Sequence, residues 1–257
     1  MSQDWIALWA PLTRSWDAWL LCVVLAVLVP FHGLLAYRRL ASVADPTPTR
    51  TKLRLYATII AMEWTLVALT VFLARRHGLT LRDLGQTLGN PGLSLAVTAL
   101  GLLGLLALTA FNTRQIRKAT RVELLATVQR ARKFVPIGPV EIWGFALVSL
   151  TAGICEELLY RGWLVSFLGA ACGSIWVGMI AAAVLFGFGH AYQGRQGIIG
   201  TGILGILFGA MYVLVRSLAP GQVIHAAVDI VNGILAGRVV RGLGQEPPIE
   251  ALPPTSA

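Results

Sequence analysis

Seven apolar runs of membrane-spanning length follow one another along the chain. They cover residues 16–37, 55–74, 93–111, 142–167, 174–190, 198–215 and 222–239. A helix needs roughly 20 apolar residues to cross the hydrocarbon core of a bilayer. The runs lack the polar and apolar alternation of barrel strands, so their backbones must satisfy their hydrogen bonds as helices. The pattern predicts an all-α, polytopic transmembrane helical bundle of seven spans, or eight if the long fourth run breaks near Gly162.

The overall composition agrees with a membrane protein. Of the 257 residues, 56% are hydrophobic and only 13% are charged, which is far more apolar than a soluble domain of this length. The first run is long enough to span and follows no strongly basic segment, so we expect it to remain as a helix rather than to be removed as a signal peptide. The three cysteines are an odd number, which argues against a disulfide framework.

The formal net charge of +9 comes from basic residues that cluster between the spans. One cluster follows the first run and another follows the third, at Arg38, Arg39, Arg50, Lys52 and Arg54, and at Arg114, Arg117, Lys118, Arg121, Arg130, Arg132 and Lys133. The positive-inside rule makes both segments cytoplasmic and the N-terminus external, although Arg75, Arg76 and Arg82 run against this orientation. Because the charges lie between spans, we expect contacts with membrane lipids and no nucleic-acid partner.

We interpret residues 1–257 as a single membrane domain, because the sequence shows no convincing internal repeat. Segment 112–139 sets Val122, Leu125 and Val128 among basic residues, and fits an amphipathic cytoplasmic helix that lies on an anionic leaflet. Residues 245–257 carry four prolines and are predicted to form a disordered tail.

Few ionisable residues lie inside the apolar runs of the C-terminal half. They are Glu156, Glu157, Arg161, His190, His225 and Asp229. A charged side chain near the bilayer centre costs from about 2.5 to more than 10 kcal/mol by different estimates, so a chain keeps one mainly where a polar cavity or a site requires it. In the N-terminal half the interiors of the three spans are nearly free of ionisable groups, and Glu63 is the exception. It lines the same cavity or pairs with a loop arginine, and we favour a structural role for it.

The spacing of these residues predicts which of them meet. Residues four apart are neighbours on a helix surface, so Glu157 can pair with Arg161, whereas Glu156 points about 100° away. The same spacing relates Phe186 to His190 and His225 to Asp229, and such a partner can fix the ring orientation of a histidine. Each pair alone is typical of a structural contact. Together, two carboxylates and two histidines on three spans indicate a functional centre.

Glutamate with histidines suits the activation of water. The water is activated either by a carboxylate base directly or through a bound divalent metal that lowers its pKa, and glutamate with two histidines is a common ligand set for zinc. No His-Glu-x-x-His, Gly-x-Ser-x-Gly or Gly-x-Gly-Asp segment is present. Their absence argues against ordinary zincins, α/β-hydrolases and presenilin-like aspartyl proteases.

Three short motifs in these spans carry a family resemblance. Glu-Glu-x-x-x-Arg is present from Glu156 to Arg161, Phe-x-x-x-His from Phe186 to His190, and His-x-x-x-Asp from His225 to Asp229. In this order the chain resembles the CPBP family, the CAAX proteases and bacteriocin-processing enzymes, also called the Abi family of intramembrane proteases. The resemblance covers a CPBP/Abi-like catalytic core at 142–237. Asp229 stands where other members have Asn.

The resemblance implies an intramembrane endopeptidase, whose eukaryotic relatives remove the last three residues of prenylated CAAX proteins. In that scheme Glu156 or Glu157 activates the attacking water together with His190, while His225 and Asp229 hold the water, a metal or the developing oxyanion. We choose Glu156 as the base, because Glu157 is better placed to pair with Arg161. Two mechanisms stay open. Either a divalent metal, zinc, is bound by Glu156, His190 and His225, or a glutamate base works without metal.

We expect a peptide or protein substrate, prenylated or not, and a multi-pass location in a bacterial inner (plasma) membrane. The alternative is a non-catalytic membrane protein: an ion- or proton-coupled transporter, or an immunity or scaffold member of the family. The polar residues gather in one half of the chain rather than in two repeated halves, which favours the enzyme. For Glu156 to meet His190 and His225, the histidine helices must end or start inside the membrane around a water-filled cavity.

Overall fold

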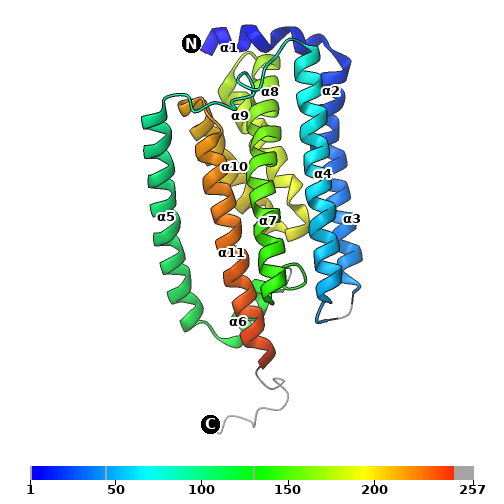
Figure 1. Cartoon of the computed structure of the whole chain (residues 1–257), viewed down its shortest axis with the longest axis vertical. Coiled ribbons are helices and arrows are strands. Elements are labelled where there is room, and N and C mark those ends of the chain that lie inside the picture. The colour runs from blue at the N-terminus through cyan, green and yellow to red at the C-terminus, as the bar shows by residue number, and fades with distance from the viewer. Residues whose placement is uncertain (1, 44, 130, 246–257) are drawn as a thin grey trace.

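The computed structural model describes residues 2–43, 45–129 and 131–245, and every regular element in these ranges is a helix (Figure 1). Six helices within them have the length and apolar composition of membrane spans: Trp16–Ala41, Thr49–Arg76, Pro91–Lys118, Pro139–Ala171, Arg195–Val215 and Ala219–Gly244. A shorter apolar helix covers Ile175–Gly189. The predicted all-α membrane bundle is therefore confirmed, and each of the seven apolar runs lies in a helix.

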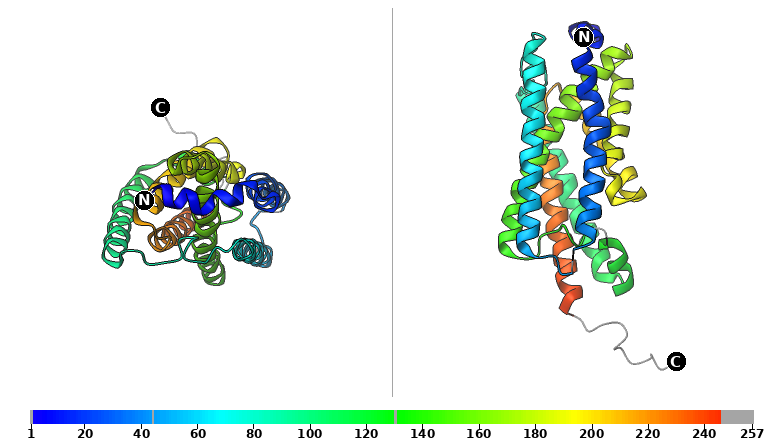
Figure 2. Two further views of the ribbon diagram at one scale, coloured as in Figure 1. Left: turned by 90° about the horizontal axis from the view of Figure 1, so that it is seen from above. Right: turned by 90° about the vertical axis from the view of Figure 1, so that its right-hand side faces the viewer.

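The first span is built from α2 (Trp16–Val23), the π-helical η2 (Val24–Leu28) and α3 (Val29–Ala41). Before it, α1 (Ser2–Trp9) and the 3₁₀ segment η1 (Ala10–Arg14) cross the upper end of the bundle (Figure 2). Trp9 is fully buried and its ring lies 5.5 Å from that of Trp163. This aromatic contact fixes the N-terminal helix to the central span.

The fourth apolar run forms one continuous helical rod, so an eighth span is absent from the described residues. It consists of α7 (Pro139–Glu156), the π-helical η3 (Glu157–Val165) and α8 (Ser166–Ala171). Gly162 does not break it, because the backbone passes from α-helical to π-helical hydrogen bonding without leaving the helix. In its most apolar window 56% of the residues are buried, which makes this rod the centre of the bundle.

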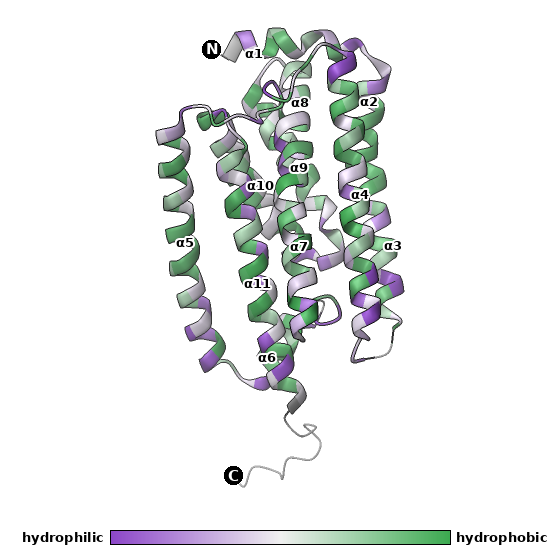
Figure 3. Cartoon of the chain, viewed as in Figure 1, coloured by the Kyte–Doolittle hydropathy of each residue, from purple (hydrophilic) through white to green (hydrophobic). Residues whose placement is uncertain are grey.

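The second span, α4 (Thr49–Arg76), and the last, α11 (Ala219–Gln245), both pack against α7. The third span, α5 (Pro91–Lys118), lies at the edge and packs on α11. Only 6% of its most apolar window is buried, and it is hydrophobic around most of its surface (Figure 3). This is the pattern of a helix that faces lipid.

The helices α9 (Ile175–Gly189) and α10 (Arg195–Val215) form a hairpin through the 3₁₀ turn η4 (Ala191–Gln193). The fifteen residues of α9 extend about 22 Å, less than the roughly 30 Å of a hydrocarbon core. The turn lies short of the lower ends of α3 and α4 (Figure 2). The chain therefore reverses before it reaches the level at which α3 and α4 end. That this level lies inside a membrane stays a prediction.

The two basic segments lie together at the lower end of the bundle, where α3 ends, α4 begins and α5 ends (Figure 1). Among the described residues of 112–138, the end of α5 and the short α6 (Arg121–Val128) are the regular helices. A capping box starts α6, and the Thr120 amide and hydroxyl, which donate to the Glu123 carboxylate, lower its pKa. The position of this segment on a leaflet stays a prediction. The predicted tail lies outside the described residues except for Gln245.

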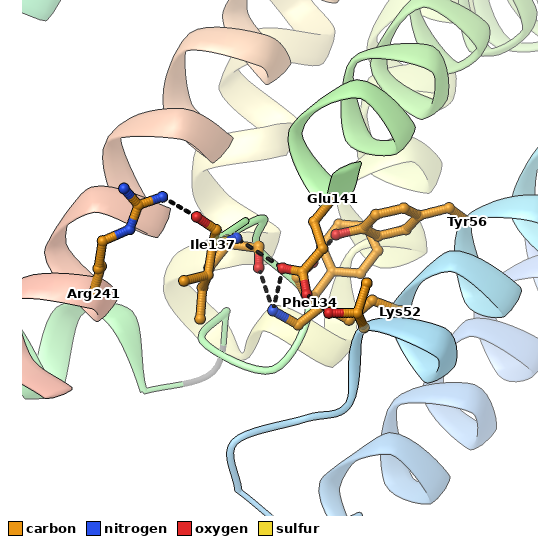
Figure 4. Close-up of polar contacts among 8 residues, drawn as sticks. Lys52, Tyr56, Phe134, Ile137, Glu141 and Arg241 are labelled. Atoms are coloured by element: carbon orange, nitrogen blue, oxygen red, sulfur yellow. Dashed lines mark hydrogen bonds and ion pairs between the residues drawn. The ribbon is translucent and has the colours of Figure 1, made fainter. Parts of the chain in front are cut away.

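A buried ion pair joins α4 to α7 at this lower end (Figure 4). Lys52 Nζ donates to Glu141 Oε2 and to the Val135 carbonyl, each at 2.9 Å, and Thr49 donates to Glu141 Oε1 at 2.6 Å. Both charged residues are almost fully buried. With its partners supplied from two helices and a loop, the pair fixes the axial register of α4 against α7.

The loop before α7 is bound by side chains from two other helices, α4 and α11. Tyr56 donates from α4 to the Phe134 carbonyl at 2.5 Å, and Arg241 donates from α11 to the Ile137 carbonyl. The Tyr56 ring also lies 5.8 Å from Phe145 on α7. The lower ends of α4, α7 and α11 are thus connected through one loop.

Candidate active site

The ion pair predicted between Glu157 and Arg161 is confirmed. Arg161 Nη1 lies 3.0 Å from Glu157 Oε1, and both side chains are buried, at 2% and 1% exposure. The guanidinium carbon lies 4.3 Å from the Phe186 ring centroid and 5.4 Å from that of Phe208. Two aromatic faces thus cover the cation inside the bundle, where it depends on the carboxylate for its charge balance.

The same carboxylate oxygen binds a histidine from the last span. Glu157 Oε1 lies 2.9 Å from Nδ1 of His225, and a carboxylate can only accept, so Nδ1 carries the hydrogen. This leaves Nε2 on the opposite side of the ring. It lies 3.6 Å from Glu156 Oε2 and 3.7 Å from Asp229 Oδ2. His225 therefore stands between the two adjacent glutamates, and Glu157, rather than Asp229, sets its tautomer.

Two glycines allow α7 and α11 to approach this closely. A Cβ at Gly153 would lie 2.7 Å from the carbonyl oxygen of Gln222, and one at Gly221 would lie 2.9 Å from Glu157 Oε2. Real Cβ contacts of that length do not occur without displacement. Small residues at a helix contact let backbones pack closely in membranes. Here they bring His225 to the buried carboxylate.

His190 ends α9 and points its Nδ1 at its own helix. Nδ1 lies 2.9 Å from the Phe186 carbonyl oxygen, which only accepts, so Nδ1 is the donor. Nε2, on the opposite side of the ring, points away from this carbonyl. The Phe186 ring lies 4.8 Å from the His190 ring and 6.1 Å from the His225 ring. Asp229 interacts electrostatically with both histidines. The Phe-x-x-x-His motif thus places one aromatic ring between the two imidazoles.

The two adjacent glutamates differ in their surroundings. Glu157 Oε1 contacts both Arg161 and His225, whereas Glu156 Oε2 is buried and has no hydrogen-bond partner among the described residues. The Glu156 side chain keeps 19% of its surface exposed, against 1% for Glu157. The structure therefore leaves one glutamate engaged and the other available.

Further residues that the sequence reasoning did not assign to the centre lie within its electrostatic range. Glu63 from α4 interacts with Glu156 and Asp229. The Tyr192 hydroxyl from η4 interacts with the same two carboxylates, and its ring lies 6.0 Å from that of His190. The available signal for Glu63 was its position as the lone acidic residue of its run. For Tyr192 the only signal was its place two residues after a motif histidine.

The predicted metal ligands do not form a ligand set as they stand. In the part of the chain that the structure describes, no three His, Cys, Asp or Glu side chains are grouped so that they could hold a metal ion. The polar contact of His225 Nε2 with Glu156 is 3.6 Å long, and His190 makes its hydrogen bond to a backbone carbonyl. Zinc at Glu156, His190 and His225 stays a prediction.

These features define a multi-pass helical membrane protein with a buried carboxylate and imidazole centre. Residues 138–231 match the family model of the type II CAAX prenyl endopeptidase Rce1-like proteins. Through that segment the chain is similar to this family of CAAX-protease-like membrane endopeptidases. All six predicted site residues fall inside the match, and Glu63 falls outside it. No curated protein and no solved structure matches the chain.

Proposed function

We propose that the protein is an intramembrane endopeptidase in which Glu156 activates the attacking water. The observation that carries this assignment is the unequal state of the two glutamates. Glu157 neutralises Arg161 and orients His225, while Glu156 Oε2 has no hydrogen-bond partner among the described residues and faces His225 Nε2 at 3.6 Å. A general base must keep a lone pair available for the proton that it accepts.

The reaction follows from these roles. Water attacks the carbonyl carbon of the scissile peptide bond, and its proton passes to Glu156. A new carbon–oxygen bond forms, and the charge that develops on the carbonyl oxygen is stabilised by the Nε2–H of a protonated imidazole, for which His225 and His190 are the candidates. The carbon–nitrogen bond then breaks, and Glu156 returns the proton to the leaving amine. The products are a shortened peptide with a free carboxyl group and a released peptide with a free amine.

Asp229 and Glu157 act on the imidazoles rather than on the substrate. The negative charge of Asp229, 3.7 Å from His225 Nε2, favours a protonated or proton-donating ring. Glu157 holds the ring in place through Nδ1. If a divalent metal binds, Glu156, His190 and His225 are the residues that would hold it, and it would supply Lewis acidity to the water.

The substrate follows from the family and is part of the proposal. A peptide or protein with its cleavage site near the membrane, prenylated or not, fits a centre placed inside the bundle. A bacterial inner membrane is the location that we propose for the protein. Membrane lipids then surround α5 and the outer faces of the other spans.

The experiment is a cleavage assay with the purified protein in lipid vesicles. A quenched fluorescent peptide ending in a farnesylated CAAX sequence is compared with its unfarnesylated form and with a panel of unrelated peptides. We expect turnover by wild type and none above background by Glu156→Ala and His190→Ala. Glu123→Gln removes a carboxylate on α6 and serves as the control. Wild-type turnover that survives in both site variants would exclude the mechanism.

A further inference from the structure

Glu63 is an acidic residue inside a membrane span, and no residue that the structure describes supplies a counter-charge for it. It is the one charged residue of α4 between Arg54 and Arg75, and only 6% of it is exposed. Within the described chain it forms no ion pair, and its Oε2 is buried without a hydrogen-bond partner. The expected pairing with a loop arginine is therefore not observed. Burying an unpaired carboxylate is costly, so a structural role does not explain its presence.

The position of Glu63 on its helix directs it toward the centre of the bundle. It belongs to the buried stripe of α4 that includes Tyr56, Val67 and Thr70, whereas its neighbour Trp64 is 46% exposed. The buried stripe packs on α7 and η3, the elements that carry Glu156 and Glu157. The carboxylate of Glu63 thus points away from lipid and into the polar centre.

The register of the two helices puts Glu63 close to the depth of Glu156. The pair between Lys52 and Glu141 aligns α4 with α7 (Figure 4). From these anchors, Glu63 lies eleven residues higher and Glu156 fifteen residues higher, or about 16 Å and 22 Å at 1.5 Å per residue. The difference is about one helical turn, which two glutamate side chains can span. In agreement, Glu63 interacts electrostatically with Glu156 and with Cys155 beside it.

Two carboxylates in one buried centre therefore each present an oxygen without a hydrogen-bond partner: Glu63 Oε2 and Glu156 Oε2. A group with two hydrogens to donate can bridge two such acceptors. The attacking water is a group of this kind. One of its hydrogens leaves for the base, and the other requires an acceptor that fixes the direction of the oxygen lone pair.

We propose that Glu63 is a further active-site residue, which accepts a hydrogen bond from the attacking water while Glu156 takes the other hydrogen as a proton. Glu63 changes no covalent bond in this step. It orients the water toward the scissile carbonyl from the side of α4. This assignment rests on the proposed function, and it draws the N-terminal half of the chain, outside the segment matched by the family model, into the reaction.

The test uses a graded series at one position. Glu63→Met keeps the volume and removes both acceptors, and Glu63→Gln keeps one acceptor oxygen without the charge. We expect kcat to fall by about 10- to 100-fold in the Met variant and by less in the Gln variant, with KM within about threefold of wild type, because a misdirected nucleophile slows the chemical step. The melting temperature should stay constant or rise, because an unpaired buried carboxylate is lost.

Thr70→Val is the matched control. Thr70 lies two turns further along the same buried face, and its hydroxyl is satisfied by the Leu66 carbonyl of its own helix. Wild-type kcat in the Glu63→Met variant, or a loss of kcat matched by a loss of melting temperature, overturns the assignment. If Glu63→Met is fully active while Glu156→Gln is inactive, this inference alone fails. If Glu156→Gln is also fully active, the proposed function fails with it.

Discussion

Glu157 and His225 are joined by a 2.9 Å hydrogen bond between Oε1 and Nδ1, which connects the central span to the last one. The contact explains why the chain places two glutamates side by side. One of them is a structural anchor that serves both Arg161 and His225. The other, Glu156, is left with an unpartnered oxygen beside the same ring. Adjacent positions on one helix therefore have separate tasks.

Removal of the Glu157 charge should damage the fold. Glu157→Leu leaves the Arg161 guanidinium buried without its counter-charge, which typically costs about 3–5 kcal/mol. We expect a marked fall in the melting temperature, measured by circular dichroism of the reconstituted protein. The double variant Glu157→Leu/Arg161→Met should regain most of the melting temperature, because a buried pair can be replaced by apolar groups. A single variant that melts like wild type would contradict the anchoring role.

The close contact of α7 with α11 should be sensitive to one methyl group. In Gly153→Ala the new Cβ meets the Gln222 carbonyl and the backbone of Ala226, so the helices must separate and His225 must move. We expect turnover to fall by about 100-fold, the scale on which a displacement of about 1 Å acts. Gly104→Ala on α5 is the control, since nothing lies within 4 Å of its Cβ. Equal activity of both variants would show that the contact does not position the site.

The substitution His190→Asn distinguishes the roles of the two ring nitrogens of His190. The Asn amide can donate to the Phe186 carbonyl as Nδ1 does, but it has no group at the position of Nε2. We expect the melting temperature to be kept and kcat to fall by about 10²- to 10⁴-fold, the usual range for a lost acid or base group. Stopped-flow cleavage under single-turnover conditions provides the rate. Retained kcat would exclude a role for Nε2.

The ion pair at the lower end of the bundle should affect stability without affecting the chemistry. Glu141 lies fifteen residues before Glu156, about 22 Å away along the rod. Lys52→Met leaves Glu141 buried and uncompensated, so we expect a lower melting temperature, and Lys52→Met/Glu141→Leu should restore it in large part. The cleavage rate per folded molecule should equal that of wild type in the restored double variant, in which the packing of α4 on α7 keeps the register. A large loss of kcat in the restored double variant would tie this end to catalysis.

Metal dependence separates the two mechanisms that the sequence left open. With Glu156 as the base, we expect cleavage to persist after removal of divalent metals by a chelator, and elemental analysis to find less than one zinc per chain. Bound zinc in a one-to-one ratio, lost from Glu156→Ala, His190→Ala and His225→Ala, would instead support the metal centre predicted from the motifs.

Much of the fold was predictable because the bilayer limits the choices. Each apolar run had to become a helix, and the ion pair of Glu157 with Arg161 follows from helical spacing alone. The π-helical form of η3 was not predictable, since the apolar pattern of residues 157–165 does not distinguish it from an α-helix.

Contacts between helices were the part of the site that the sequence could not supply. The spacing suggested Asp229 as the partner that orients His225, whereas Glu157 from another span forms that hydrogen bond. Glu63 was placed with the structural residues for the same reason, because only the register of α4 against α7 shows which carboxylates it meets. Local periodicity predicts which residues are neighbours on one helix, but it does not predict contacts between residues of two different helices.

The most direct measurement is the cleavage rate of Glu156→Gln beside that of wild type, in the same vesicles and at saturating peptide, with the melting temperature of each. This substitution keeps the shape of the side chain and removes its capacity to accept a proton. The account predicts at least a 100-fold lower rate with an unchanged melting temperature. A Glu156→Gln protein that cleaves the peptide at the wild-type rate would contradict the assignment of Glu156 as the base.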